Sequence, residues 1–281
     1  MRRRWLLAAV CSAPLARAVE PVTVTAGTVS LWLAEGAVNY MGGQAMASIM
    51  GDPSIRDVKK WIRAAIEEIK SFIAAELQRQ ITDQYINETI DRIEGMRLDL
   101  LDYGASKDQR ILLQQFGSNM NTWIAVTKRF GLPSVMIYAN AVSLKMLVLS
   151  AFVKDHGERA YIERLEATAE EGSSHLRAMI SENNTWLDEG VASVGPPVYT
   201  NQPRFIPNWD CGFTFRGGRD GAGDNNRGLA EQKCNAKREE RIAAFKREKE
   251  AAQTTLHLPL LRSIEGWNAA VTVAKKLQAN K

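Results

Sequence analysis

The sequence predicts an all-α protein: a bundle of about seven helices around one central hydrophobic helix, with a long disulfide-closed loop before the last helices. Three observations predict this fold. Apolar residues recur every three or four positions over most of the chain. The stretch 134–153 is apolar or small on every side of a helical wheel. Glycine, proline, asparagine and aspartate are concentrated in one long segment, 191–228.

The first residues are typical of a secretory signal. A basic start, a short apolar run and a small-x-small cleavage site follow one another at 2–4, 5–13 and 16–18. We therefore expect a secreted protein with a signal peptide over 1–18 and a single helical-bundle domain over 19–281. A lipoprotein anchor on Cys11 is the alternative, but the bulky Val10 before it fits that motif poorly.

Composition and charge exclude few classes of function. The net charge of +4 comes from interspersed acidic and basic residues rather than from a basic block, so no nucleic-acid partner is expected. The hydrophobic content of 45% is ordinary for a globular protein.

Before the central stretch, the sequence predicts an extended arm and then helices. Residues 19–30 are rich in β-branched side chains, which suit an extended arm. Residues 31–50 suit a mobile helix or a pair of short ones, because glycines interrupt this stretch. Asp52 as N-cap and Pro53 begin a long amphipathic helix with a possible break near Thr82 and Asp83. Tyr103-Gly104 ends it.

A helical hairpin is predicted next. Ser106 and Gln109 form a capping box for a helix over 107–130, and Gly131-Leu132-Pro133 is too short for anything but a turn into the central helix. The residues expected to face inward on 107–130 are Ile111, Leu112, Phe116, Met120, Trp123, Ile124 and Val126. The polar ones are Gln114, Gln115, Asn119, Asn121, Lys128 and Arg129.

The central stretch, SVMIYANAVSLKMLVLSAFV, is interrupted only by Asn140, Ser143, Lys145 and Ser150. At about 1.5 Å of rise per residue it spans roughly 30 Å, enough to cross a bilayer core or to form the axis of a soluble bundle. The sequence leaves both interpretations open. Gly157 is expected to end this helix in a left-handed conformation.

The rest of the chain is expected to be helical on either side of an irregular insertion. One amphipathic helix covers 158–189, and a charged helix begins at about Leu229. Pro259 is expected to kink or break the helix before the last one, 260–277. Within the irregular loop 191–228, only 213–215 alternates as a short strand would.

Once the signal is removed, Cys211 and Cys234 are the cysteines of the mature chain. In an oxidising compartment we expect them to form a disulfide, worth roughly 3 kcal/mol in the loop-entropy model. Two free thiols in a cytosolic protein are the alternative, which the signal disfavours.

The run Tyr138-Ala139-x-Ala141-x-x-Leu144-x-x-Leu147-x-Leu149 resembles the YAxAxxLxLLxL helix of the N-terminal helical domain of the three-domain insecticidal delta-endotoxins. Shorter matches are Tyr161, Arg164, Leu165, Thr168 and His175 on the next helix, and Phe245-Lys-Arg-Glu248. The long disulfide loop and the missing C-terminal β domains depart from the family pattern, and so do two positions of the central helix. Ser150-Ala151 replaces its Arg-Asp pair, and Lys145 replaces its mid-helix polar residue.

The resemblance implies a toxin-like protein whose hairpin 107–153 enters a lipid membrane and oligomerises with other copies into a pore, with a protein receptor as a possible further partner. A charge at mid-helix costs about 3 kcal/mol in lipid, so Lys145 should face the lumen, be paired, or extend to the interface. The residues assigned to membrane insertion are Trp123, Lys128, Pro133, Tyr138, Leu144, Lys145, Leu147 and Leu149.

The alternative is a secreted helical protein that binds a protein partner through the loop 191–234 without entering a membrane. Its expected contact residues are Phe205, Trp209, Phe213 and Phe215. We expect no enzyme and no cofactor, because no nucleophile elbow, phosphate loop or cofactor fingerprint is present. We expect no metal either: the three histidines are far apart, and the match of 220–231 to a calcium loop fails at Ala222 and Asn225.

Overall fold

The computed structural model describes residues 26–50, 83–105, 110–202 and 208–279. Several predicted features lie outside these residues: the signal peptide, the arm over 19–25, the helix start at Asp52 and Pro53, the capping box, and Phe205.

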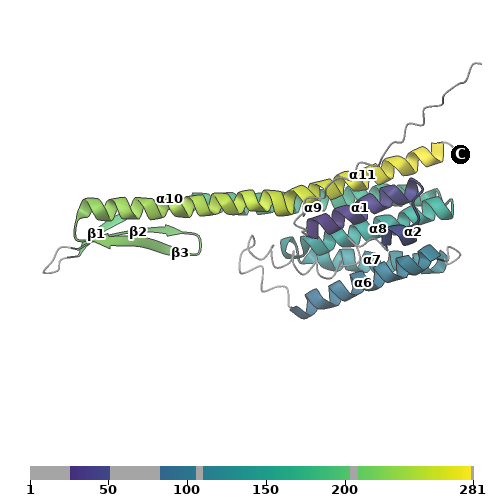
Figure 1. Ribbon diagram of the computed structural model, residues 1–281, viewed down its shortest axis with the longest axis horizontal. Helices are drawn as coiled ribbons and strands as arrows, with labels where there is room; N and C mark the ends of the chain where they lie inside the picture. Colours follow the sequence, from purple (N-terminus) through teal and green to yellow (C-terminus); the bar gives the residue numbers. More distant parts are fainter. Residues whose placement is uncertain (1–25, 51–82, 106–109, 203–207, 280–281) are drawn as a thin grey trace, which may run out of the picture.

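The described chain forms a helical bundle from which a long helical arm extends to a small β-sheet (Figure 1). The predicted all-α bundle around a central hydrophobic helix is confirmed. Its central helix is α8 (Val135–Asp155). The helices around it are α1 (Ala26–Met41), α2 (Met46–Met50), α6 (Asp83–Ala105), α7 (Arg110–Arg129), α9 (Ala160–Ala192) and α11 (Leu258–Ala279).

The central helix is enclosed on all sides. Every residue from Val135 to Val153 is buried except Lys145. Helices α1, α7, α9 and α11 pack directly against it, and α6 contacts it more sparsely. An all-round apolar helix is stable only in such an environment or in lipid, which accounts for the central place of α8 in the bundle.

Helices α7 and α8 form the predicted hairpin. A 3₁₀ turn, Leu132–Ser134, follows Gly131, whose φ of 61° favours glycine. Ile111 corrects the prediction, because its side chain is 69% exposed. Leu113, two positions on, faces the core instead, and two positions on a helix lie about 200° apart.

The N-terminal helix also corrects a prediction. Residues 26–30, expected to be extended, belong to α1. Tertiary contacts outweigh the β-branched composition here: the hydroxyls of Ser30 and Ser263 are hydrogen-bonded over 2.7 Å, and Gly266 of α11 lies against Ala34. Of the two alternatives for 31–50, one mobile helix or a pair of short ones, the structure has two helices, the rest of α1 and the short α2.

The segment 191–228 is more regular than predicted. It forms an antiparallel sheet in the order β1–β2–β3, with β1 (Val198–Gln202), β2 (Asn208–Phe215) and β3 (Gly218–Asp224). The predicted strand at 213–215 is confirmed as the end of β2. The predicted disulfide is also confirmed: Cys211 of β2 is bonded to Cys234 of α10 (Arg227–Ala252), with Cα atoms 5.9 Å apart.

The sheet packs against α10. Arg216, in the turn after β2, also attaches the sheet to α9. The Arg216 guanidinium carbon lies 3.5 Å from the centre of the Trp186 ring of α9, and its Nη1 donates to the Trp186 carbonyl. Gly190 lies beside it, where a Cβ would be 2.6 Å from Arg216 Nη2 and would displace the guanidinium.

Helices α10 and α11 are joined by a π-helical turn, Gln253–His257, just before Pro259. Pro259 was expected to kink or break the helix. The chain instead stays helical, with one turn of the wider π-helix. This turn makes room for the proline ring, which in an ordinary α-helix would clash with the carbonyl four residues earlier. His257 of this turn is buried and hydrogen-bonded to Asn183 Oδ1 of α9 over 2.8 Å.

Candidate functional site

Helix α8 is the one helix in the described part of the chain that is long and apolar enough to cross a membrane. The core helix of a soluble protein meets the same criteria, so this property alone does not distinguish the two interpretations. The hydrogen bonds of the polar side chains of α8 bear on the choice between these two interpretations.

Two polar side chains of α8 donate hydrogen bonds to carbonyls of their own helix, while Asn140 Oδ1 has no partner among the described residues. Asn140 Nδ2 donates to the Met136 carbonyl over 2.8 Å, and the Ser150 hydroxyl donates to the Met146 carbonyl over 2.7 Å. Ser143 differs, because its hydroxyl donates to the Ser30 carbonyl of α1 over 3.0 Å. It also accepts from Trp267 Nε1 of α11 over 2.8 Å. Ser143 therefore ties α8 to the bundle, whereas Asn140 and Ser150 do not.

Tyr138 of α8 packs edge-on against His175 of α9, with ring centres 4.4 Å apart. Neither the Tyr138 hydroxyl nor His175 Nε2 has a hydrogen-bond partner among the described residues. Burial raises the pKa of Tyr138 and lowers the pKa of His175. Both groups are therefore held in their neutral forms at neutral pH.

At its other end, α8 is held by a polar cluster around Asp155. The hydroxyls of Tyr40 (α1) and Tyr103 (α6) both donate to Asp155 Oδ2, the second over 2.9 Å. Lys154 donates to the Tyr40 carbonyl and lies 4.1 Å above the Tyr40 ring. Three helices thus meet at the C-terminal end of α8.

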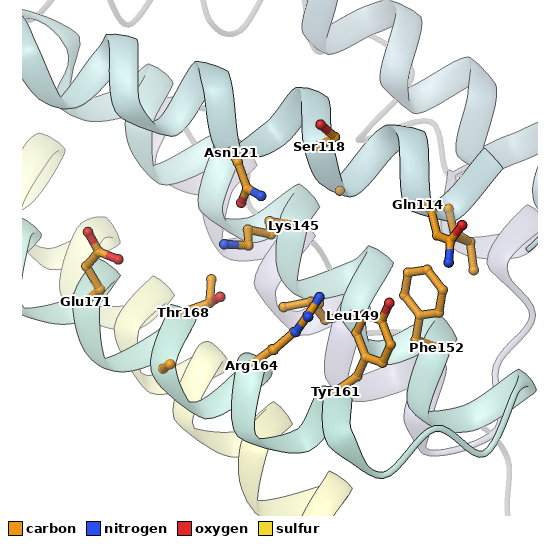
Figure 2. A pocket seen from close by; sticks show the side chains of 13 residues that line it. Gln114, Ser118, Asn121, Lys145, Leu149, Phe152, Tyr161, Arg164, Thr168 and Glu171 are labelled. Carbon is orange, nitrogen blue, oxygen red and sulfur yellow. The ribbon is translucent and has the colours of Figure 1, made fainter. Parts of the chain in front are cut away.

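A cleft of about 650 Å³ opens where α7, α8 and α9 meet. Helix α7 contributes one face, with Gln114, Ser118 and Asn121 spaced four and three residues apart. Figure 2 shows the polar side chains of Lys145, Asn121, Thr168 and Glu171 gathered toward one end of the cleft, and Leu149, Phe152 and Tyr161 toward the other.

Lys145 lies in this cleft and not in the apolar core. Its ammonium nitrogen lies near Asn121 of α7 (Figure 2). Its pKa is lowered, chiefly because burial removes hydration from the ammonium and further because of Arg164; Glu171 offsets part of this effect. Glu171 itself is paired with Lys128 of α7, Nζ to Oε1 2.8 Å.

The structure brings together only some of the predicted insertion residues. Lys145 and Leu149 line the cleft, and Lys128 contacts one of its walls through Glu171. Leu144 and Leu147 are fully buried on other sides of α8, and Leu147 faces Gly36 of α1. Trp123 packs under the Arg92 guanidinium of α6 at 5.8 Å. Pro133 lies in the 3₁₀ turn.

Sequence reasoning missed Arg164, Glu171 and the polar row on α7 as parts of one site. The spacing of Gln114, Ser118 and Asn121 was the available signal, since these residues share one helix face. Nothing local indicated that this face meets Lys145.

Of the predicted loop contacts, Phe213 is buried, whereas Trp209 and Phe215 are partly exposed. Phe213 is 1% exposed and forms the small core between the sheet and α10, because alternate residues of β2 face that helix. Phe215 and Trp209 are partly covered, by Arg241 at 4.2 Å and by Arg227 at 5.2 Å. The large apolar side chains exposed in the described part of this region are instead Val198, Tyr199 and Leu229.

Within the described residues, no three His, Cys, Asp or Glu side chains are grouped as metal ligands would be. Two acidic residues of the partial calcium match form ion pairs with lysines of α10: Asp220 with Lys237, and Asp224 with Lys233.

No protein-family model, no curated protein and no solved structure matches the chain.

Proposed function

We propose that this is a secreted, toxin-like protein that permeabilises membranes by releasing the α7–α8 hairpin from its bundle into lipid, where copies assemble into a pore. The observation that carries the proposal is the pairing of a membrane-length helix, buried on all sides, with an antiparallel partner that has a polar face. The two are joined by a three-residue turn, so they would leave the bundle together.

Helix α8 needs little change to be stable in lipid. Its backbone hydrogen bonds are internal, and the bonds of Asn140 and Ser150 end on carbonyls of the same helix, so they move with it. Of the bonds described for its buried polar side chains, those of Ser143 to α1 and α11 are lost on leaving the bundle.

Lys145 supports the proposal by its position. It lies on the side of α8 that faces the polar row of α7, and not on a side that would face lipid. In an inserted hairpin, Lys145 and Asn121 would share the seam that faces a water-filled lumen. A lipid-facing lysine would instead cost about 3 kcal/mol.

Release requires a hinge and the rupture of a few polar contacts. Gly157, with φ of 64°, lies between α8 and α9 and can serve as the hinge. The contacts to be broken include the Lys128–Glu171 ion pair, the bonds of Ser143 and Asp155, and the bond from Lys154 to the Tyr40 carbonyl.

The test is a covalent lock at an exposed ion pair. Lys128→Cys with Glu171→Cys, bridged by a short bis-maleimide in a Cys11→Ser background, ties α7 to α9. The matched control bridges Asp188→Cys with Lys249→Cys, an exposed pair 2.5 Å apart that ties α9 to α10 and leaves the hairpin free. Dye release is measured from phosphatidylcholine vesicles with increasing phosphatidylglycerol.

We expect the unbridged proteins and the bridged control to release dye, and the bridged hairpin lock to release none. Equal release by both bridged proteins would contradict insertion of the hairpin. If the folded wild type releases no dye from any vesicle, before or after limited proteolysis, the pore proposal fails. That outcome would favour the alternative function, binding of a protein partner through the exposed Val198 and Tyr199 of the edge strand β1.

A further inference from the structure

The cleft between α7, α8 and α9 is lined by two cations, the half-buried Lys145 and the exposed Arg164, and neither forms an ion pair with a described residue. Lys145 forms no hydrogen bond and no ion pair with any described residue, although its side chain is half-buried. Burial removes hydration from this ammonium, and the nearby Glu171 offsets only part of that loss. Such a group is stabilised when an anion enters beside it.

Arg164 is the second cation. Its guanidinium carbon lies 4.9 Å from the centre of the Tyr161 ring, which holds it over an aromatic face, and it forms no ion pair within the described chain. Glu171 is the one acidic residue among those that line the cleft, and Lys128 already engages its carboxylate at 2.8 Å. The cleft is therefore electropositive.

The other end of the cleft is apolar. Phe152 of α8 and Tyr161 of α9 stack in parallel with ring centres 4.1 Å apart, and Leu149 lies beside them. An inorganic anion would leave this end unused. The volume of about 650 Å³ lies within the range of pockets that hold small organic ligands.

We propose that this cleft binds an organic anion with one acid group and a short apolar chain. The acid group lies between Lys145 and Arg164, and the chain lies on Leu149, Phe152 and Tyr161. Asn121 on the α7 wall, at the same end of the cleft as Lys145, supplies a further hydrogen bond to the acid group. This site does not depend on membrane insertion and would stand if the pore proposal failed.

Binding is tested by isothermal titration calorimetry of the full chain with three probes: octanoate, octanol and inorganic phosphate. Octanoate has both the acid group and the chain, whereas each of the others has one. We expect octanoate to bind at least about tenfold more tightly than either. Absence of octanoate binding, or equal binding of phosphate or octanol, would overturn the proposal.

Variants locate the site. We expect Lys145→Gln and Arg164→Gln each to weaken octanoate binding about tenfold, the scale of one charge-assisted hydrogen bond. Lys275→Gln, which removes an exposed cation of α11 paired with Glu166, should leave it unchanged. Circular dichroism confirms that each variant is folded, and a folded Lys145→Gln that binds octanoate as tightly as the wild type would refute the site.

The variant Lys145→Arg tests the role of Lys145 independently, through the pH dependence of binding. The charged groups that face Lys145 are Arg164 and Glu171 of α9, with Lys128 of α7 beside Glu171. Wild-type binding should weaken as the pH rises through the lowered pKa of Lys145, whereas Lys145→Arg should keep its affinity because a guanidinium stays charged. Identical pH profiles for the two proteins would contradict a role for Lys145.

Discussion

The indole Nε1 of Trp267 donates a hydrogen bond to the Ser143 hydroxyl over 2.8 Å, and that hydroxyl donates onward to the Ser30 carbonyl over 3.0 Å. The three groups belong to α11, α8 and α1 and are fully buried. In a low-dielectric interior such linked bonds strengthen one another, and each is costly to leave unmade. They form the polar attachment of the central helix to the helices that cover it.

Ser143→Ala should lower the free energy of unfolding by about 1–3 kcal/mol, because it leaves the buried Trp267 N–H without an acceptor. Ser150→Ala is the matched control. The hydroxyl of Ser150 bonds only to a carbonyl of its own turn, so its loss should cost much less. Urea unfolding followed by tryptophan fluorescence measures both. Equal costs for the two variants would contradict the role given to Ser143.

Gly172 of α9 lies where a Cβ would be 3.0 Å from both Trp267 Cζ3 and Val142 Cγ1. Trp267 cannot retreat without stretching its bond to Ser143, so Gly172→Ala should destabilise the protein by about 1–3 kcal/mol through overpacking. Gly95→Ala, in α6 with no described neighbour within 4 Å of the added Cβ, should instead stabilise it by about 0.5–1 kcal/mol. Thermal unfolding of both variants checks the opposite signs.

Burial lowers the pKa of His257, and burial with the nearby Lys128 lowers that of His175. Each folded-state pKa lies below the unfolded value of about 6.5, so the unfolded chain binds more protons in acid. The stability contributed by both residues is complete above that value and is lost as the pH falls toward their folded pKa values. His257→Gln should reduce this acid sensitivity, measured as the free energy of unfolding between pH 8 and 5.

Replacing both Cys211 and Cys234 by serine should loosen the sheet and leave the bundle intact. The bridge closes a loop with a sequence separation of 23, worth about 3 kcal/mol in the loop-entropy model. Hydrogen exchange should accelerate at β2 amides and remain slow at α8 amides, because the two parts have separate cores. Equal acceleration in α8 would show that the sheet supports the bundle.

Much of the fold could be predicted because its signals are local. Helical periodicity located α7, α8, α9 and α10, and Gly157 marked the end of α8. The strand β3 could not be predicted in this way. Its sequence, GRDGAGD, has no β-branched or aromatic residue, and it is a strand only because β2 pairs with it.

The sequence by itself determined that one helix is apolar on every side and must be enclosed, and that a polar-faced helix is tied antiparallel to it. Only the tertiary structure decided where its polar residues point: Ser143 toward Trp267, which is 124 positions away, and Lys145 toward the cleft with Arg164. Periodicity describes the faces of a single helix. Which neighbour covers each face depends on packing between segments distant in the chain, and that information is present in no short stretch of sequence.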